Sequence, residues 1–148
     1  MPAFQQKSFE QLTTIELFEI YRVRVAVFVV EQTCAYQEVD DLDVQAQHLF
    51  TQDSAGAITA YARLIDEGPQ VRIGRVLVAP TNRGNGAGRR LVSTAITAAH
   101  QTYPAAQAIV IQAQAYLQKF YASFGFQPTS AVYLDTGIPH IDMVLPLT

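Results

Sequence analysis

A glycine-rich turn between a strand-like run and a helix-like run carries the strongest chemical signal in this sequence. Apolar Val76, Leu77 and Val78 are followed, after a proline, by the run Arg83-Gly84-Asn85-Gly86-Ala87-Gly88-Arg89. Backbone N–H groups at the start of a helix bind anions, because the helix dipole lies behind them. Glycines allow a phosphate to approach that backbone closely. The turn therefore predicts a diphosphate site, and Arg89 adds positive charge beside it.

The spacing of the glycines excludes two common diphosphate motifs. The dinucleotide fingerprint Gly-x-Gly-x-x-Gly would place its third glycine where Arg89 stands, and it expects an acidic residue about 20 positions further on, which is also missing. A P-loop requires Gly-Lys-Ser/Thr, and this turn has no lysine. The remaining pattern is Arg-Gly-x-Gly-x-Gly after a strand. A tight strand-to-helix connection without a ligand is the alternative interpretation.

Three side chains elsewhere in the chain have the chemistry to move protons. The phenol of Tyr121 is protonated at neutral pH, because tyrosine has a pKa of about 10, and it can act as an acid; it could also be a buried aromatic residue packed on Leu117. Histidine titrates near neutrality, which makes His140 a candidate base or a hydrogen-bonded structural residue. Glu31, which ends an apolar helical run, is a second candidate base or a surface carboxylate.

Charged residues outside these positions allow more than one interpretation. The acidic run of Glu38, Asp40, Asp41 and Asp43 could attract a cationic amine, although runs of like charge are usually solvated. Arg63 and Arg75 lie inside predicted strands, where each could bind an anionic group or form a salt bridge.

Metal binding and cysteine chemistry are not expected. The acidic run lacks the glycine and the final glutamate of an EF-hand loop, and no Cys/His cluster has zinc spacing, so no metal site is predicted. Cys34, the single cysteine, is interpreted as a small apolar residue, and His48 in its predicted strand as a structural one.

The apolar periodicity predicts a mixed α/β domain with at least one βαβ crossover. A helix is expected over 13–29, begun by a capping box of Thr13 and Glu16, with Phe18, Tyr21, Val25 and Phe28 on its apolar face. Strands are predicted at 47–51, 57–64, 71–78, 108–112, 127–133 and 139–145, and further helices at 86–99 and 117–124. Residues 1–148 contain no linker or repeat and are interpreted as a single domain.

The order of these elements, and several short segments, resemble the GNAT (GCN5-related N-acetyltransferase) superfamily and its ElaA-like branch. The glycine turn matches the superfamily's acetyl-CoA motif. The segments 27–32, 61–63, 73–76, 112–114, 120–126 and 137–141 resemble the branch more closely. The resemblance implies a three-layer α/β/α GNAT acyl-CoA N-acyltransferase fold with a splayed, mixed central sheet.

The resemblance also implies roles for individual residues. Pantetheine would hydrogen-bond to the backbone of Val76, Leu77 and Val78, and the pyrophosphate would bind backbone N–H groups from Arg83 or Gly84 through Asn85, Gly86, Ala87 and Gly88 to Arg89. Gln114 falls where many relatives have an asparagine that contacts the cofactor, and Tyr121 falls at the tyrosine that commonly protonates the leaving thiolate. Many relatives carry a glutamate base on the strand after the long helix, but the strand predicted here at 108–112 has no carboxylate. Glu31, His140 or a water relay are therefore the candidate bases.

Composition sets limits on function. The 148 residues carry a net charge of −3, which argues against a nucleic-acid binder, and they contain no membrane-length apolar run and no secretory signal.

A cytoplasmic N-acetyltransferase that uses acetyl-CoA and an unidentified amine is the leading hypothesis, with no nucleic-acid or membrane partner. Dimers are common in the superfamily, so a homodimer is left open. The alternative is a non-catalytic sensor or scaffold of the same fold that binds acyl-CoA.

Overall fold

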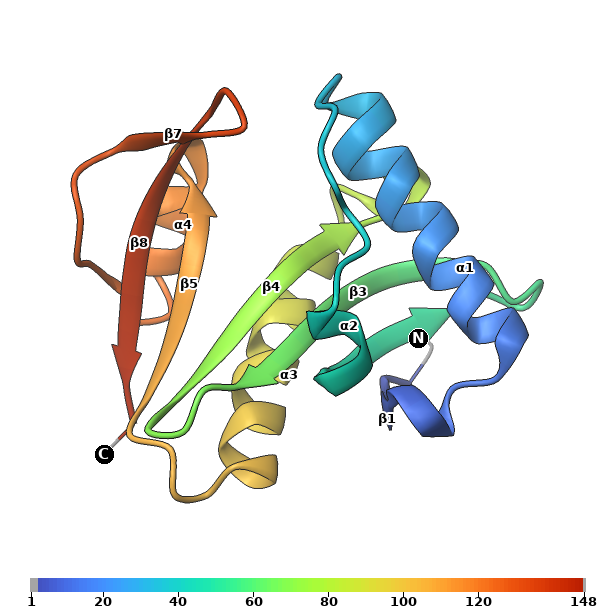
Figure 1. Cartoon of the computed structure of the whole chain (residues 1–148), viewed down its shortest axis with the longest axis horizontal. Helices are drawn as coiled ribbons and strands as arrows, with labels where there is room; N and C mark the ends of the chain where they lie inside the picture. Colours follow the sequence, from blue (N-terminus) through green and yellow to red (C-terminus); the bar gives the residue numbers. More distant parts are fainter. Residues whose placement is uncertain (1–2, 148) are drawn as a thin grey trace.

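The computed structural model describes residues 3–147 and builds them around one mixed sheet (Figure 1). The strands run in the order β1-β2-β3-β4-β5-β8-β6, and β7 pairs with β8. Their bounds are β1 Gln5–Ser8, β2 Gln47–Gln52, β3 Ile58–Asp66, β4 Gln70–Val78, β5 Ala108–Gln114, β6 Gln127–Pro128, β7 Tyr133–Asp135 and β8 Ile138–Pro146. Among the described pairs, β4 and β5 are parallel and the others are antiparallel. The predicted mixed α/β class with a βαβ crossover is confirmed.

Helices cover both faces of the sheet. On one face lie α1 (Thr14–Arg24), a π-helix (Val25–Glu31) that continues it, and α2 (Leu42–Gln45); on the other lie α3 (Ala87–Thr102) and α4 (Gln118–Ala122) (Figure 1). Alternation along β3 shows the two cores: Ala60, Ala62 and Leu64 pack with α3, whereas Tyr61 packs with Ile20 of α1. The candidate site lies where two strands of this sheet, β4 and β5, diverge.

The first long helix differs from its prediction in two ways. Its capping box is confirmed, because Thr13 Oγ1 accepts from the N–H of Glu16 and Glu16 Oε1 accepts from the N–H of Thr13. The α-helix ends at Arg24 rather than at 29, and the chain continues as a π-helix. The predicted apolar face is only half correct: Tyr21 and Phe28 pack against a buried cluster, whereas Phe18 is 58% and Val25 38% exposed. Arg24 is completely buried, and a buried arginine is invisible to apolar periodicity.

Strands β4 and β5 begin side by side and then diverge, which opens the sheet. They pair only through Gln70–Ala108, Val71–Ile109 and Arg72–Val110. Beyond that point β4 pairs only with β3, and β5 only with β8. Figure 1 shows the two strands spreading apart toward the upper edge of the view. A stretch of backbone on each strand therefore faces the gap instead of another strand.

A β-bulge at Arg75 reverses the side-chain alternation of β4 inside this divergent stretch. Val71 and Ile73 pack in the α3 core before it, and Val76 and Val78 do so after it. One extra residue between Ile73 and Val76 accounts for the change of parity, and Arg75 adopts the left-handed conformation with φ +52°. Because of the bulge, the side chain of Leu77 packs on the side of the π-helix, and the last residues of β4 lead toward the site.

Candidate active site

A cavity of about 680 Å³ occupies the gap between β4 and β5. Its walls come from both sheet faces, so it passes through the sheet rather than lying on one side. The π-helix contributes Val27 and Phe28, α3 contributes Gly88 and Val92, and the β7–β8 hairpin contributes Asp135 and His140. Of the residues predicted to act at a site, the cavity is lined by Glu31, Val76, Leu77, Val78, Arg83, Gly84, Gly88, Gln114, Tyr121 and His140.

The glycine turn leads directly into α3, as predicted. Gly86 is the N-cap with φ +81°, a conformation that glycine adopts without steric cost. Arg90 Nη1 donates to the carbonyl of Asn85 and holds the turn closed at 3.0 Å. The first N–H groups of α3 have no acceptor within the helix and lie at its positive end, which suits an anion.

Four residues of this segment that were predicted to bind the cofactor do not line the cavity: Asn85, Gly86, Ala87 and Arg89. The side chain of Arg89 instead lies against α4. Its guanidinium is 4.7 Å from the ring centroid of Phe124 and donates to Ser123 Oγ at 2.9 Å. Arg89 therefore fixes α4, which carries Tyr121, against α3.

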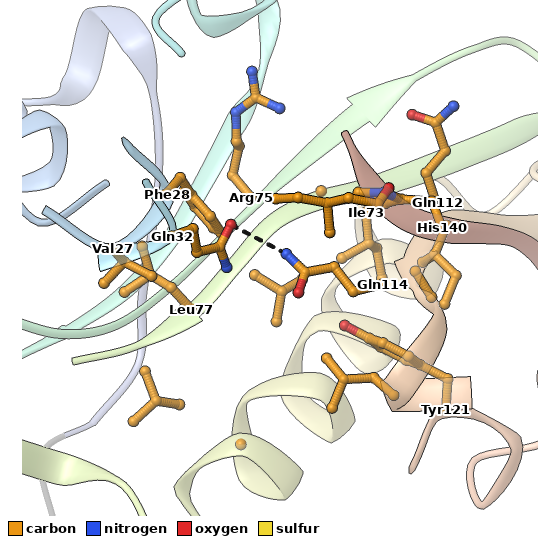
Figure 2. Close-up of a pocket in the computed structure, with 18 of the residues that line it drawn as sticks. Val27, Phe28, Gln32, Ile73, Arg75, Leu77, Gln112, Gln114, Tyr121 and His140 are labelled. Atoms are coloured by element: carbon orange, nitrogen blue, oxygen red, sulfur yellow. Dashed lines mark hydrogen bonds between the residues drawn. The ribbon is translucent and has the colours of Figure 1, made fainter. Parts of the chain in front are cut away.

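Tyr121 lies at the bottom of the cavity, and Figure 2 shows its hydroxyl directed into the cavity on the side of Gln114. Only 6% of the residue is exposed, and its ring packs edge-on against Phe120 and Phe126. Burial raises the pKa of Tyr121 to about 12. The phenol is therefore fully protonated at neutral pH and presents a hydrogen-bond donor to the cavity.

His140 occupies the opposite part of the wall, in register with Gln114 on β5 and Tyr133 on β7. Its Nδ1 lies 2.7 Å from the carbonyl oxygen of Ile138. A carbonyl can only accept, so Nδ1 must carry the proton, and in the neutral ring Nε2 keeps a free lone pair. The stacked ring of Tyr133 fixes the plane of the imidazole. A neutral imidazole held in this way can accept a proton or a hydrogen bond at Nε2.

Glu31 is held in a different way. Both oxygens accept from Arg83, Oε2 from Nη1 at 2.7 Å and Oε1 from Nη2 at 3.0 Å, and Arg83 Nε donates to the carbonyl of Val78. The hydrogen bonds from Arg83 lower the pKa of Glu31. A carboxylate paired in this way is a weak base, so the geometry favours a role in holding Arg83 beside the glycine turn.

Two further contacts from the segment after the π-helix bridge the cavity, and sequence reasoning did not anticipate them. Gln114 Nε2 donates to Gln32 Oε1 at 3.3 Å, as the dashed line in Figure 2 shows. The thiol of Cys34 donates to Thr136 Oγ1 in the β7–β8 turn at 3.2 Å. Both partners are more than eighty positions away along the chain, so no local pattern signals these contacts.

A buried network of ion pairs supports the rim of the cavity, and it corrects the expectation that the acidic run is solvated, which holds only for the exposed Asp41. Arg24 bonds to Asp43 at 2.6 Å and to Glu38 at 2.9 Å, and all three residues are at most 3% exposed. Arg63 bonds to Asp40 and Asp43, and Arg75 pairs with Glu38. Of the two interpretations of Arg63 and Arg75, the structure shows the salt bridge.

Opposite charges and hydrogen bonds within this network offset the cost of burying its carboxylates. Burial alone would raise the pKa of Asp43, but its hydrogen bonds and the charge of Arg24 outweigh burial and lower it. The structural interpretation of His48 is consistent with its contacts, because its ring nitrogens lie 2.6 Å from Tyr61 Oη and 2.9 Å from the carbonyl of Asp43. The network thus fixes segment 38–43 against β3 and β4, next to the cavity.

Residues 3–147 contain neither a metal-binding cluster nor a helix of membrane-spanning length and apolarity. No group of three or more His, Cys, Asp or Glu side chains is arranged there to hold a metal ion. No helix in that range is long and apolar enough to cross a membrane.

Comparisons with known proteins agree with this architecture. A family model described as an acetyltransferase (GNAT) domain matches residues 14–147. The UPF0039 protein C11D3.02c of Schizosaccharomyces pombe is 46% identical and covers 97% of each chain. The crystal structure of an acyl-CoA N-acyltransferase from Pseudomonas aeruginosa is 39% identical, with a TM-score of 0.92 over 98% of this chain and 99% of that one. Escherichia coli ElaA is 36% identical, with a TM-score of 0.91 over 97% and 99%.

Proposed function

Because the chain belongs to the ElaA-like branch of the GNAT acetyltransferase superfamily, we propose that it transfers an acetyl group from acetyl-CoA to a primary amine. The amine attacks the thioester directly, with both substrates bound at once. The observation that carries this proposal is a single cavity that connects the glycine turn, the free edge of β4, Tyr121 and His140. Holding both substrates in one cleft supplies much of the reduction in barrier.

The cofactor half of the cavity has groups that could contact each part of acetyl-CoA. The extended pantetheine arm would pair, as an added strand does, with the edge of β4 at Val76, Leu77 and Val78, which faces no other strand and where the Val78 carbonyl accepts from Arg83 Nε. The diphosphate would bind the free N–H groups at the start of α3. Apolar Val27, Phe28 and Val92 line the space between and would exclude water. Gln114, at the end of β5, lies where the two halves meet.

The reaction requires one bond to form and one to break. The amine nitrogen attacks the thioester carbon, the C–S bond breaks, and the electron pair leaves on sulfur. We assign the proton lost by the amine to Nε2 of His140, because Nδ1 is already bonded to the Ile138 carbonyl. A relay through water stays an alternative route, whereas Glu31 is disfavoured by its pairing with Arg83.

Tyr121 would stabilise the leaving sulfur. An alkyl thiol has a pKa of about 8.5, well below the pKa of about 12 to which burial raises the phenol of Tyr121. Complete proton transfer from Tyr121 to a thiolate is therefore unfavourable. We expect the hydroxyl to donate a hydrogen bond as negative charge develops on sulfur, and solvent to supply the proton after release.

A non-catalytic sensor of acyl-CoA is the second candidate function. The observation that favours it is β5, Ala108–Gln114, which contains no carboxylate to serve as a base. Such a sensor would bind acetyl-CoA but would acetylate no amine. Turnover by the wild-type protein that Tyr121→Phe reduces therefore favours the enzyme, whereas acetyl-CoA binding without turnover favours the sensor.

Gly88 offers a direct test of the proposed cofactor site. A β-carbon at Gly88 would meet only Phe120 Cζ, at 3.9 Å, and the backbone there is ordinary helix, so a larger residue is tolerated by the fold. We expect Gly88→Leu to fill part of the cavity and weaken acetyl-CoA binding by at least roughly tenfold in isothermal titration calorimetry. Ser93→Leu, on the exposed side of the same helix, is the control and should bind normally. Equal affinities for the two variants would contradict the assignment of the site.

A further inference from the structure

Charge pairing inside the cavity leaves one group without a counterion. The charged side chains that line the cavity and have an opposite charge within ion-pair distance are Glu31, Arg63, Arg72, Arg75 and Arg83. Asp135 is the exception, since no cationic side chain in residues 3–147 lies within that distance of its carboxylate. The cavity thus offers an acceptor one unpaired anion and no unpaired cation.

Asp135 also lies on the same surface as the candidate base. Strand β7 pairs Tyr133 with His140 and Asp135 with Ile138, so Asp135 and His140 are diagonal neighbours on one face of the hairpin. Diagonal positions in an antiparallel pair are roughly 7–8 Å apart. A short aliphatic chain can span this separation, with one end at each side chain.

From this placement we infer that the acceptor is a short diamine or polyamine, and that Asp135 binds its distal ammonium group while His140 receives the proton from the reacting amine. The inference rests on the proposed acetyl transfer and specifies its acceptor. The same charges disfavour a free amino acid as the acceptor, because the arginines that could bind its carboxylate are already paired with Asp40, Asp43, Glu38 and Glu67. An acceptor carboxylate would meet Asp135 instead and be repelled.

Three amines of matched chain length test the inference by steady-state kinetics. Putrescine carries a second ammonium, butylamine carries none, and γ-aminobutyrate carries a carboxylate. We expect kcat/KM with acetyl-CoA to favour putrescine over butylamine by roughly ten- to hundredfold, as one hydrogen bond to a charged group gives, and γ-aminobutyrate to be the poorest of the three. Asp135→Asn should reduce the putrescine-to-butylamine ratio of kcat/KM to about one, because the charged hydrogen-bond acceptor is lost. Glu10→Gln removes an exposed carboxylate outside the cavity and should keep the ratio.

A binding measurement separates failure of this inference from failure of the proposed function. Calorimetry with putrescine and the CoA complex reports the Asp135 contact without turnover. Putrescine binding that Asp135→Asn weakens supports the inference even where no amine is acetylated. A wild-type preference for butylamine or γ-aminobutyrate, or no putrescine binding to the CoA complex, overturns the inference, and acetylation of butylamine in that case leaves the proposed function standing.

Discussion

Replacing Arg24 by alanine is expected to lower the free energy of unfolding by about 3–5 kcal/mol, because it removes one of the two cationic partners from each of two buried carboxylates. Arg24 is completely buried and bonds to Glu38 and Asp43, which are 3% and 0% exposed. Its guanidinium also lies over the ring of Tyr61 at 5.6 Å. Chemical denaturation followed by circular dichroism measures the loss.

Arg22→Ala is the matched control for Arg24→Ala. Arg22 lies on the same helix, but its side chain is 60% exposed and pairs only with Glu19. Exposed pairs of this kind contribute about 0.2–1 kcal/mol, so the variant should be nearly as stable as the wild type. If the two variants lose similar amounts of unfolding free energy, the buried network stabilises the fold and the rim of the cavity no more than an exposed ion pair does.

Tyr121→Phe is expected to lower kcat by roughly 100-fold while leaving the dissociation constant of acetyl-CoA nearly unchanged. Removing one donor from developing charge in a water-poor site typically costs about 10²–10³ in kcat. The remaining ring keeps its edge-on contacts with Phe120 and Phe126, so the fold should be retained. Single-turnover kinetics with saturating acetyl-CoA measure the chemical step, and calorimetry measures the affinity.

Tyr103→Phe serves as the control, because Tyr103 lies beyond the far end of α3 and does not line the cavity. Removal of its hydroxyl should leave both constants unaltered. A Tyr121→Phe enzyme with wild-type kcat would exclude the hydroxyl from the chemistry and favour a purely structural ring. A parallel loss of acetyl-CoA affinity would instead mean that Tyr121 shapes the binding site.

Features that depend on neighbouring residues could be predicted from the sequence. The Thr13–Glu16 capping box involves residues three positions apart, and the glycine turn sets its own backbone between a strand and a helix. The apolar stripe of α3 specifies which face of that helix is buried. These local rules were sufficient for the mixed α/β class and for the position of the crossover. They missed β1 at the sheet edge, and they merged β6 and β7 into one strand predicted at 127–133.

Features that depend on distant pairing could not be predicted in the same way. Arg24 interrupts an apolar run in the sequence, and its burial becomes favourable only when Glu38 and Asp43 fold back onto it. Likewise, Glu31 was a plausible base until Arg83, 52 positions away, was seen to hold both of its oxygens. Charge pairing of this kind is a property of the folded chain, and it decides which side chains are left free for substrates.

Mass spectrometry of putrescine after incubation with the protein and acetyl-CoA tests acetyl transfer most directly. Acetyl transfer gives a product heavier by one acetyl group and an equal amount of free CoA, both dependent on active protein. Their formation should be strongly reduced in the Tyr121→Phe variant. Tight binding of acetyl-CoA with no acetylated product from putrescine or any other amine would contradict acetyl transfer and identify the chain as a sensor.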